Sequence, residues 1–159
     1  MEIEVVNAGV SGDTSAGGLA RLVWVLGQGA DVLVVELGGN DGLRGGSLEN
    51  TESNLRQIVQ RGRDSGASVL LLGMDIPTNF GPDYTTAFAE MYRKIADDEG
   101  ATLVPGFIRE VGMDFSLMQP DGIHPTAEGH NHLAKILVPY LEDALANLPD
   151  DEMHSPADF

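Results

Sequence analysis

Apolar residues recur along the chain with two alternating spacings. Short apolar runs, typical of strands buried in a parallel sheet, occur at residues 3–6, 31–37, 68–72 and 102–104. The three- and four-residue spacing of amphipathic helices covers residues 15–28, 48–63 and 84–99, and it returns in a last helix after Thr126. This alternation predicts an α/β fold in three layers, with helices on both faces of a parallel sheet.

The apolar spacing also predicts which helix faces are buried. The first helix is expected to bury Leu19, Leu22, Val23 and Leu26. Thr126 can cap the last helix, whose apolar residues are Leu133, Ile136, Leu137, Tyr140, Leu141 and Leu145. The loop over residues 73–81 is expected to lack regular structure because of Pro77 and Pro82.

Segments rich in glycine and polar residues follow the predicted strands or precede the last helix. They are residues 7–14, 38–41 and 121–125. Ligands of parallel α/β folds bind beyond the carboxyl ends of the strands. We therefore expect all three segments at one edge of the sheet, where they would form the functional site.

The third segment contains an acid and an imidazole three residues apart, Asp121 and His124. Pro125 restricts His124 to extended backbone. A carboxylate bonded to Nδ1 of an imidazole fixes the tautomer that leaves Nε2 free to accept a proton. The pair is a candidate orienting acid and general base, although each residue taken alone also fits an Asp-Gly turn beside a surface histidine.

The other two segments supply candidate hydrogen-bond donors. A backbone N–H at Gly12 and the side-chain amide of Asn40 are suitable donors to the oxyanion of a tetrahedral intermediate. Taken alone, residues 11–14 also fit a loop that enters a helix capped by Asp13 or Thr14. Residues 38–41 also fit a tight turn with Asn40 in the left-handed region. Neither G-x-G-x-x-G nor a Walker A pattern occurs, so a dinucleotide site is unsupported.

Net charge and the length of the apolar runs argue against two classes of partner, nucleic acids and membranes. The chain has 25 acidic and 9 basic residues, for a formal charge of −16. Such a surface repels phosphate backbones, so we expect no nucleic-acid partner. The apolar runs are too short to cross a bilayer, and we expect no transmembrane segment. The sequence has no cysteine, and we expect no secretion signal in the chain as written, because no basic region followed by an apolar region comes after Met1. The cellular compartment stays unassigned.

The three segments together resemble a known family. Ser11-Gly12-Asp13-Thr14, Gly38-Gly39-Asn40-Asp41 and Asp121-Gly122-Ile123-His124-Pro125 are similar, in this order and spacing, to blocks two, three and five of the SGNH (GDSL-type) hydrolases. The similarity runs from Val5 to about Leu145 and is greatest with the bacterial acyl-CoA thioesterase, lysophospholipase and arylesterase branch. Residues 35–45 are particularly characteristic of this branch.

The resemblance implies a three-layer α/β/α fold with a flavodoxin-like parallel sheet. It also implies a serine hydrolase of small acyl esters or thioesters, without a metal or an organic cofactor. By this resemblance Gly12 and Asn40 match the oxyanion donors, Asp121 the triad acid and His124 the general base. Members of the family are often periplasmic or secreted.

One block of the family has no match in this sequence. In the family a Gly-Asp-Ser-Leu block on the first strand supplies the nucleophile, and Gly12-Asp13-Thr14 fits block two instead. Met1 falls just before the family's second strand, so we expect that the first strand and the serine lie upstream, as after a truncated or misassigned gene start. The chain as written is then expected to be inactive. The alternative is a catalytically inactive remnant with at most a binding role.

Three further expectations complete the sequence-based description. Residues 1–147 would form one N-terminally truncated hydrolase domain, and residues 148–159 a disordered acidic tail. The missing strand would leave backbone groups unpaired and favour self-association. Six apolar residues either line an acyl pocket or pack in the core: Met74, Ile76, Phe80, Phe115, Leu117 and Met118.

Overall fold

The computed structural model describes residues 3–148. Its elements follow in the order α1 (Ser15–Leu26), β1 (Val32–Val35), α2 (Gly39–Leu43), α3 (Leu48–Asp64), β2 (Ser68–Leu72), η1 (Thr78–Phe80), α4 (Pro82–Glu99), β3 (Thr102–Val104), α5 (Arg109–Gly112), η2 (Phe115–Leu117) and α6 (Ala127–Ala146). The predicted strands at 31–37, 68–72 and 102–104 are confirmed as β1, β2 and β3, and the four predicted helices as α1, α3, α4 and α6.

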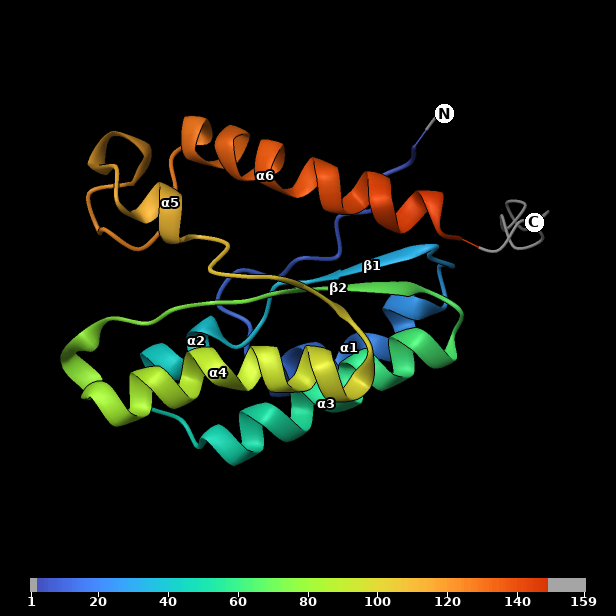
Figure 1. The fold of residues 1–159 in the computed structure, drawn as a ribbon, viewed down its shortest axis with the longest axis horizontal. Coiled ribbons are helices and arrows are strands. Elements are labelled where there is room, and N and C mark those ends of the chain that lie inside the picture. Colours follow the sequence, from blue (N-terminus) through green and yellow to red (C-terminus); the bar gives the residue numbers. More distant parts are fainter. Residues whose placement is uncertain (1–2, 149–159) are drawn as a thin grey trace.

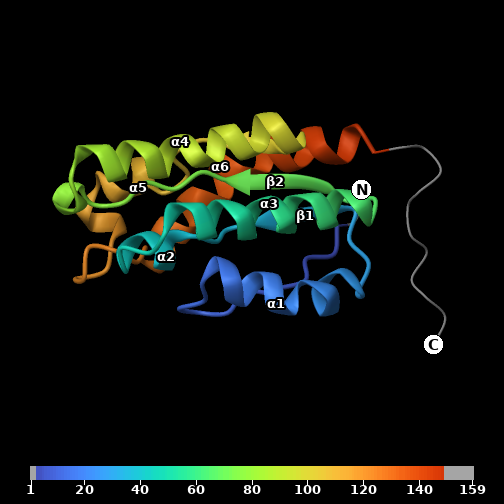
Figure 2. The ribbon, with the colours of Figure 1, turned by 90° about the horizontal axis from the view of Figure 1, so that it is seen from below.

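The three strands form a parallel sheet in the order β1-β2-β3. Val32 pairs with Ser68 at the start of β1, and Leu72 pairs with Val104 at the end of β2. Helix α6 covers one face of this sheet and contacts all three strands, whereas α3 and α4 cover the other face and α1 packs against α3 (Figures 1 and 2). The predicted α/β fold in three layers is confirmed.

Two hydrophobic clusters hold the layers together. The cluster on the α3 and α4 side includes Val69 and Leu71 of β2, and the cluster on the α6 side includes Leu72. Side chains of a strand alternate between its faces, so one short strand contributes to both clusters. In α6, Leu133 is buried and Ile136, Leu137 and Tyr140 pack against the second cluster.

Side-chain caps set the start of three helices. Thr14, Ser47 and Thr126 are the N-cap residues of α1, α3 and α6, and each side chain accepts a hydrogen bond from a backbone N–H in the first turn. The prediction that Thr126 caps the last helix is confirmed. Of the two candidates at α1, Thr14 is the cap.

The strand predicted at residues 3–6 is wrong. Residues 3–10 carry no regular secondary structure, and Ile3, Val5 and Val6 are 57%, 85% and 57% exposed. Isolated extended segments gain no ladder of hydrogen bonds, so apolar residues alone do not make a strand. Within residues 3–148 the only strand paired with β1 is β2, and no strand pairs with the opposite edge of β1.

Two smaller expectations also need correction. Val23 was expected in the core, yet its side chain is 72% exposed, because α1 buries the face formed by Ser15, Gly18 and Leu22. The loop over residues 73–81 contains one turn of 3₁₀ helix, η1, between its two prolines. Apart from Leu148, the predicted tail lies outside the described residues.

Candidate active site

The three polar segments lie at one end of the molecule, as predicted from the sequence. All three parallel strands end there, and both views show α2, α5 and the first turn of α6 at this end (Figures 1 and 2). Helix α1 begins at the same end, directly after residues 7–14 (Figure 2). The fold therefore brings the candidate residues to the edge at which parallel α/β proteins bind ligands.

Asp121 and His124 are in direct contact. His124 Nδ1 lies 2.8 Å from Asp121 Oδ2, and Asp121 Oδ1 accepts hydrogen bonds from the backbone N–H groups of Ile123 and His124, each at 3.0 Å. Gly122 makes this turn possible with a φ of 66°. The carboxylate thus binds both the backbone and Nδ1 of His124, and Nε2 makes no contact with it.

These contacts stabilise the ionised form of Asp121. The hydrogen bond with His124 is the largest cause, and together with the two backbone donors it lowers the Asp121 pKa to about 2. The side chains of His124 and Asp121 are 65% and 47% exposed. At neutral pH the pair therefore consists of a charged acceptor and an accessible imidazole, the arrangement that a general base requires.

Asn40 lies in the first turn of the short helix α2, and the sequence-based alternative of a left-handed Asn is wrong. Within the described residues every positive φ belongs to a glycine, and here Gly38 has it, at 99°. The Tyr92 hydroxyl donates to the Leu37 carbonyl at 2.9 Å and lies directly against Gly38. Burial raises the pKa of Tyr92 well above its usual value, so the phenol stays protonated and keeps donating.

Asn40 and the loop around Gly12 are joined by a hydrogen bond. Asn40 Nδ2 donates to the Asp13 carbonyl at 3.0 Å, which orients the amide and leaves its second N–H available. The loop is held further by Arg21, whose Nε lies 2.8 Å from Asp13 Oδ2 and whose guanidinium also donates to the Ala8 carbonyl. Gly12 has a φ of 77°, and its carbonyl accepts from Arg44 at 3.3 Å.

The four candidate residues thus form two directly bonded groups: Asp121 with His124, and Asn40 with the segment that follows Gly12. Both groups lie at the same end of the sheet (Figures 1 and 2). Among the described residues no hydrogen bond joins one group to the other.

Most of the six apolar residues that flank the site pack in the core. Ile76 and Met118 are buried, while Met74, Phe80 and Leu117 are partly buried against the two clusters. Phe115 is different, because it is 87% exposed. Five of the six therefore pack against the core, and Phe115 is by far the most accessible of them.

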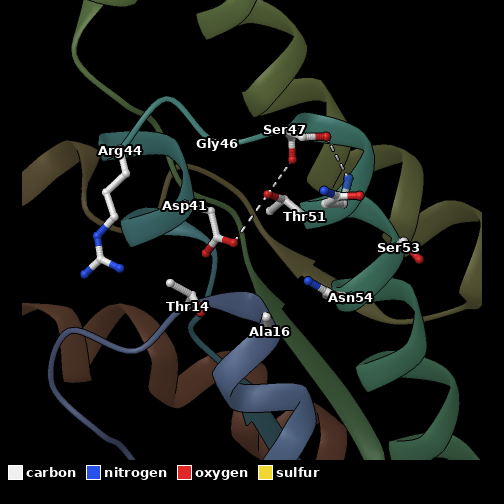
Figure 3. Close-up of a pocket in the computed structure, with 10 residues that line it drawn as sticks. Thr14, Ala16, Asp41, Arg44, Gly46, Ser47, Thr51, Ser53 and Asn54 are labelled. Atoms are coloured by element: carbon white, nitrogen blue, oxygen red, sulfur yellow. Dashed lines mark hydrogen bonds between the residues drawn. The ribbon is translucent and has the colours of Figure 1, made fainter.

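Asp41 is a residue of the site region for which the motifs predicted no role. Both of its carboxylate oxygens accept hydrogen bonds from Ser15, the first residue of α1. Asp41 also lies at a cavity of about 420 Å³ between the starts of α1 and α3, where most of the lining residues are polar (Figure 3). Its place next to Asn40 in a glycine-rich segment was the available signal, but its partner 26 residues away was not apparent from spacing.

Within residues 3–148 no three side chains of His, Asp or Glu cluster closely enough to hold a metal ion. None of the described helices combines the length and the hydropathy needed to span a bilayer.

Comparison with known proteins identifies the family. The model of the GDSL-like Lipase/Acylhydrolase family matches residues 2–132. The chain belongs to this family. The resemblance found from the sequence motifs is therefore confirmed.

Relatives of this GDSL-family chain are named ester and thioester hydrolases. Esterase TesA of Pseudomonas aeruginosa is 47% identical over 145 residues, which are 91% of this chain and 72% of the relative. Thioesterase 1/protease 1/lysophospholipase L1 of Escherichia coli K12 is 44% identical over 139 residues, which are 87% of this chain and 67% of the relative. A crystal structure of TesA superposes with a TM-score of 0.84 at 46% identity, covering 89% of this chain and 79% of that structure.

Proposed function

We propose that this chain carries the acid, the base and two oxyanion donors of a Ser-His-Asp ester or thioester hydrolase. The serine would come from a segment outside these 159 residues. The observation that carries the proposal is the 2.8 Å contact of His124 Nδ1 with Asp121, which leaves Nε2 of an exposed ring free. The names of the relatives support the class of substrate, an acyl ester or thioester.

In the proposed reaction the serine hydroxyl attacks the acyl carbonyl while His124 Nε2 takes its proton. Asp121 stabilises the imidazolium that forms. The oxyanion accepts hydrogen bonds from the Gly12 N–H and from the free N–H of Asn40. Collapse of the intermediate breaks the bond to the alcohol or thiol, which leaves with the proton from His124. Water, activated by the same imidazole, then releases the acid and regenerates the serine.

The serine would sit on a strand beside the free edge of β1. That edge has unpaired backbone groups within the described structure, and β1 leads directly to Gly38 and Asn40. A strand added there in parallel would end at the same edge of the sheet as the candidate residues. The sequence contains no Gly-Asp-Ser block that could supply it.

Labelling with a fluorophosphonate tests the proposal. The 159-residue chain should not be labelled and should show no burst of product. The chain extended upstream by a Gly-Asp-Ser strand should be labelled and should show the burst. In the extended protein His124→Ala should lower turnover by several orders of magnitude, and Asn40→Ala by about 10²–10³. Lys135→Ala on α6, outside these contacts, serves as the control.

Two outcomes would contradict this reading. A label on Ser11 or Thr14 of the 159-residue chain would assign the nucleophile to this chain. A folded, extended protein that hydrolyses no acyl ester or thioester in a broad panel would favour the second candidate, an inactive remnant whose role is at most binding.

A further inference from the structure

Asp41 links α2 to the start of α1 through both carboxylate oxygens. Oδ2 accepts from the Ser15 backbone N–H at 2.8 Å, and Oδ1 accepts from the Ser15 hydroxyl at 2.7 Å. Ser15 is fully buried, and its hydroxyl also accepts from Asn54 Nδ2 of α3 at 3.0 Å. Figure 3 shows Asp41 pointing toward the start of α1 and the first turns of α3.

This link is not needed to cap α1. Thr14 already is the N-cap, and its hydroxyl accepts from the Gly17 N–H. The Asp41 carboxylate adds a second acceptor from a distant part of the chain, where a negative charge is also favoured by the helix dipole. Its particular effect is therefore to fix the position of α1 and its preceding loop relative to α2.

Asp41 and Asn40 together attach the loop at two points. Asn40 Nδ2 binds the Asp13 carbonyl, and the next residue, Asp41, binds Ser15. These two attachment points, Asp13 and Ser15, lie on either side of Thr14 and restrict both translation and rotation of the loop against α2. Gly12 directly precedes the first of these points, so its N–H is held at a set distance from the Asn40 amide.

We propose that Asp41 is a positioning residue that sets the Gly12 N–H and the Asn40 amide at the separation needed to bind one oxyanion. The inference deepens the proposed function and rests on it. Preorganised donors accelerate a reaction only when they already point to the position of the developing charge. Asp41 touches no reacting atom, and its contribution is made through Ser15.

The test uses Asp41→Asn, which keeps the size of the side chain but replaces one acceptor oxygen by a donor. Ser47→Ala is the matched control, because it removes the N-cap of α3 beside the same cavity without a bond to Asp41. In the extended protein Asp41→Asn should lower kcat about 10-fold, less than loss of a donor, and leave KM within about 2-fold. Ser47→Ala should leave both unchanged at temperatures below unfolding.

A double mutant separates positioning from general destabilisation. In an Asn40→Ala background Asp41→Asn should lower kcat much less than in the wild type, because one of the two donors is already absent. Full additivity of the two effects would overturn the proposal. If Asp41→Asn does not fold, Ser15→Ala removes the hydroxyl bonds with Asp41 and Asn54 and keeps the backbone bond to Asp41. It should lower kcat in the same direction, and an unchanged kcat would equally overturn the proposal.

Amide NMR of the extended protein gives an answer independent of activity. Asp41→Asn should shift the signals of the Asn40 side-chain amide and of the Gly12 backbone amide, whereas Ser47→Ala should change neither. Unchanged signals in Asp41→Asn would refute the positioning role. An inactive extended wild type with these NMR changes would instead refute the proposed function and leave the positioning of the two donors supported.

Discussion

Gly38 shows how a single residue at the sheet edge is constrained. Its φ is 99°, and a Cβ built on it would lie 2.3 Å from the Tyr92 hydroxyl oxygen. Gly38→Ala therefore combines backbone strain with a clash, and we expect it to destabilise the fold by about 2–4 kcal/mol. Urea unfolding would measure the loss.

A second variant separates the two causes. Tyr92→Phe removes the hydroxyl and should relieve the steric part, so the cost of Gly38→Ala should be smaller in that background. An equal cost in both backgrounds would show that backbone strain alone is responsible.

The pKa of Asp121 provides a test of its contact with His124. In His124→Ala the largest cause of the lowered pKa is lost, so the pKa should rise from about 2 toward its usual value, while the two backbone donors keep it somewhat lowered. Because the folded pKa is lowered, the stabilisation is complete above the unfolded pKa and is lost as the pH falls toward 2.

Carboxyl ¹³C NMR during an acid titration would measure this shift. His132→Ala, another exposed histidine of the α6 region, should leave the Asp121 pKa at about 2. An unchanged Asp121 pKa in His124→Ala would mean that the ring does not bind the carboxylate in solution.

At the residue scale, contacts between residues of the same turn could be predicted from the sequence. Asp121 and His124 are three residues apart, so their contact follows from local geometry. The bond between Asp41 and Ser15 joins α2 to α1 across 26 residues of sequence, so it depends on tertiary packing, and no periodicity in the sequence encodes it. The loss of Val23 from the predicted core has the same origin, because the helix spacing fixes the period but not the buried direction.

At the element scale, Arg56 joins α3 to α4. Its guanidinium contacts Glu52 on its own helix and Asp98 and Glu99 on α4, at 2.7–2.8 Å, with a side chain only 20% exposed. Arg56→Gln would remove the positive charge that neutralises these acids, and we expect the free energy of unfolding to fall by about 1–2 kcal/mol at neutral pH. Lys94→Gln is the control, since Lys94 is 61% exposed and binds Glu52 alone.

The loss should depend on pH. Hydrogen bonds with Lys94 and Arg56 lower the pKa of Glu52, and bonds with Gln60 and Arg56 lower the pKa of Glu99. Lowered carboxyl pKa values stabilise the fold above the unfolded value of 4.5, and this contribution is lost as the pH falls below it. The difference between wild type and Arg56→Gln in urea unfolding should therefore be constant above about pH 5 and shrink as the pH falls below 4.5, and a difference that grows there would contradict the assignment.

Strands were predicted correctly where the strands that pair with them are present in the described structure. Strands β1 to β3 pair with one another and lie between helices, so their apolar runs form the expected ladder. Residues 3–6 have a similar apolar pattern but no partner within the described structure, and they form no strand. Helices such as α3 satisfy their own backbone, which is why their bounds follow closely from sequence spacing and caps.

At the scale of the whole molecule, charge repulsion opposes folding. With 25 acids against 9 bases, most carboxylates lack a positive partner, and added salt screens their repulsion. We expect the melting temperature to rise by about 3–6 °C between low salt and about 0.5 M NaCl. Circular dichroism would measure it, and a fall in melting temperature would show that the ion pairs outweigh the repulsion.

The free edge of β1 and the exposed apolar residues around the N-terminal region predict self-association. Val5, Val6 and Val10 are more than half exposed, as are Val23 and Trp24 on α1, and Val34 on the edge strand is 38% exposed. An unpaired strand edge with apolar neighbours is a template for another chain. We therefore expect the chain to form dimers or larger species at micromolar concentrations, with their fraction rising in salt as the repulsion is screened.

Light scattering after size-exclusion chromatography would measure the mass at low and high salt. Val34→Lys places a charge on the edge strand and should shift the population toward monomer. Val138→Lys on α6 is the control, because Val138 is similarly exposed, at 45%, but lies on a helix. Addition of the upstream strand should also reduce association, since it would occupy the edge of β1. A monodisperse monomer of the 159-residue chain with sharp cooperative melting at every salt concentration would contradict the prediction, and it would mean that the β1 edge is protected in solution by residues of the same chain.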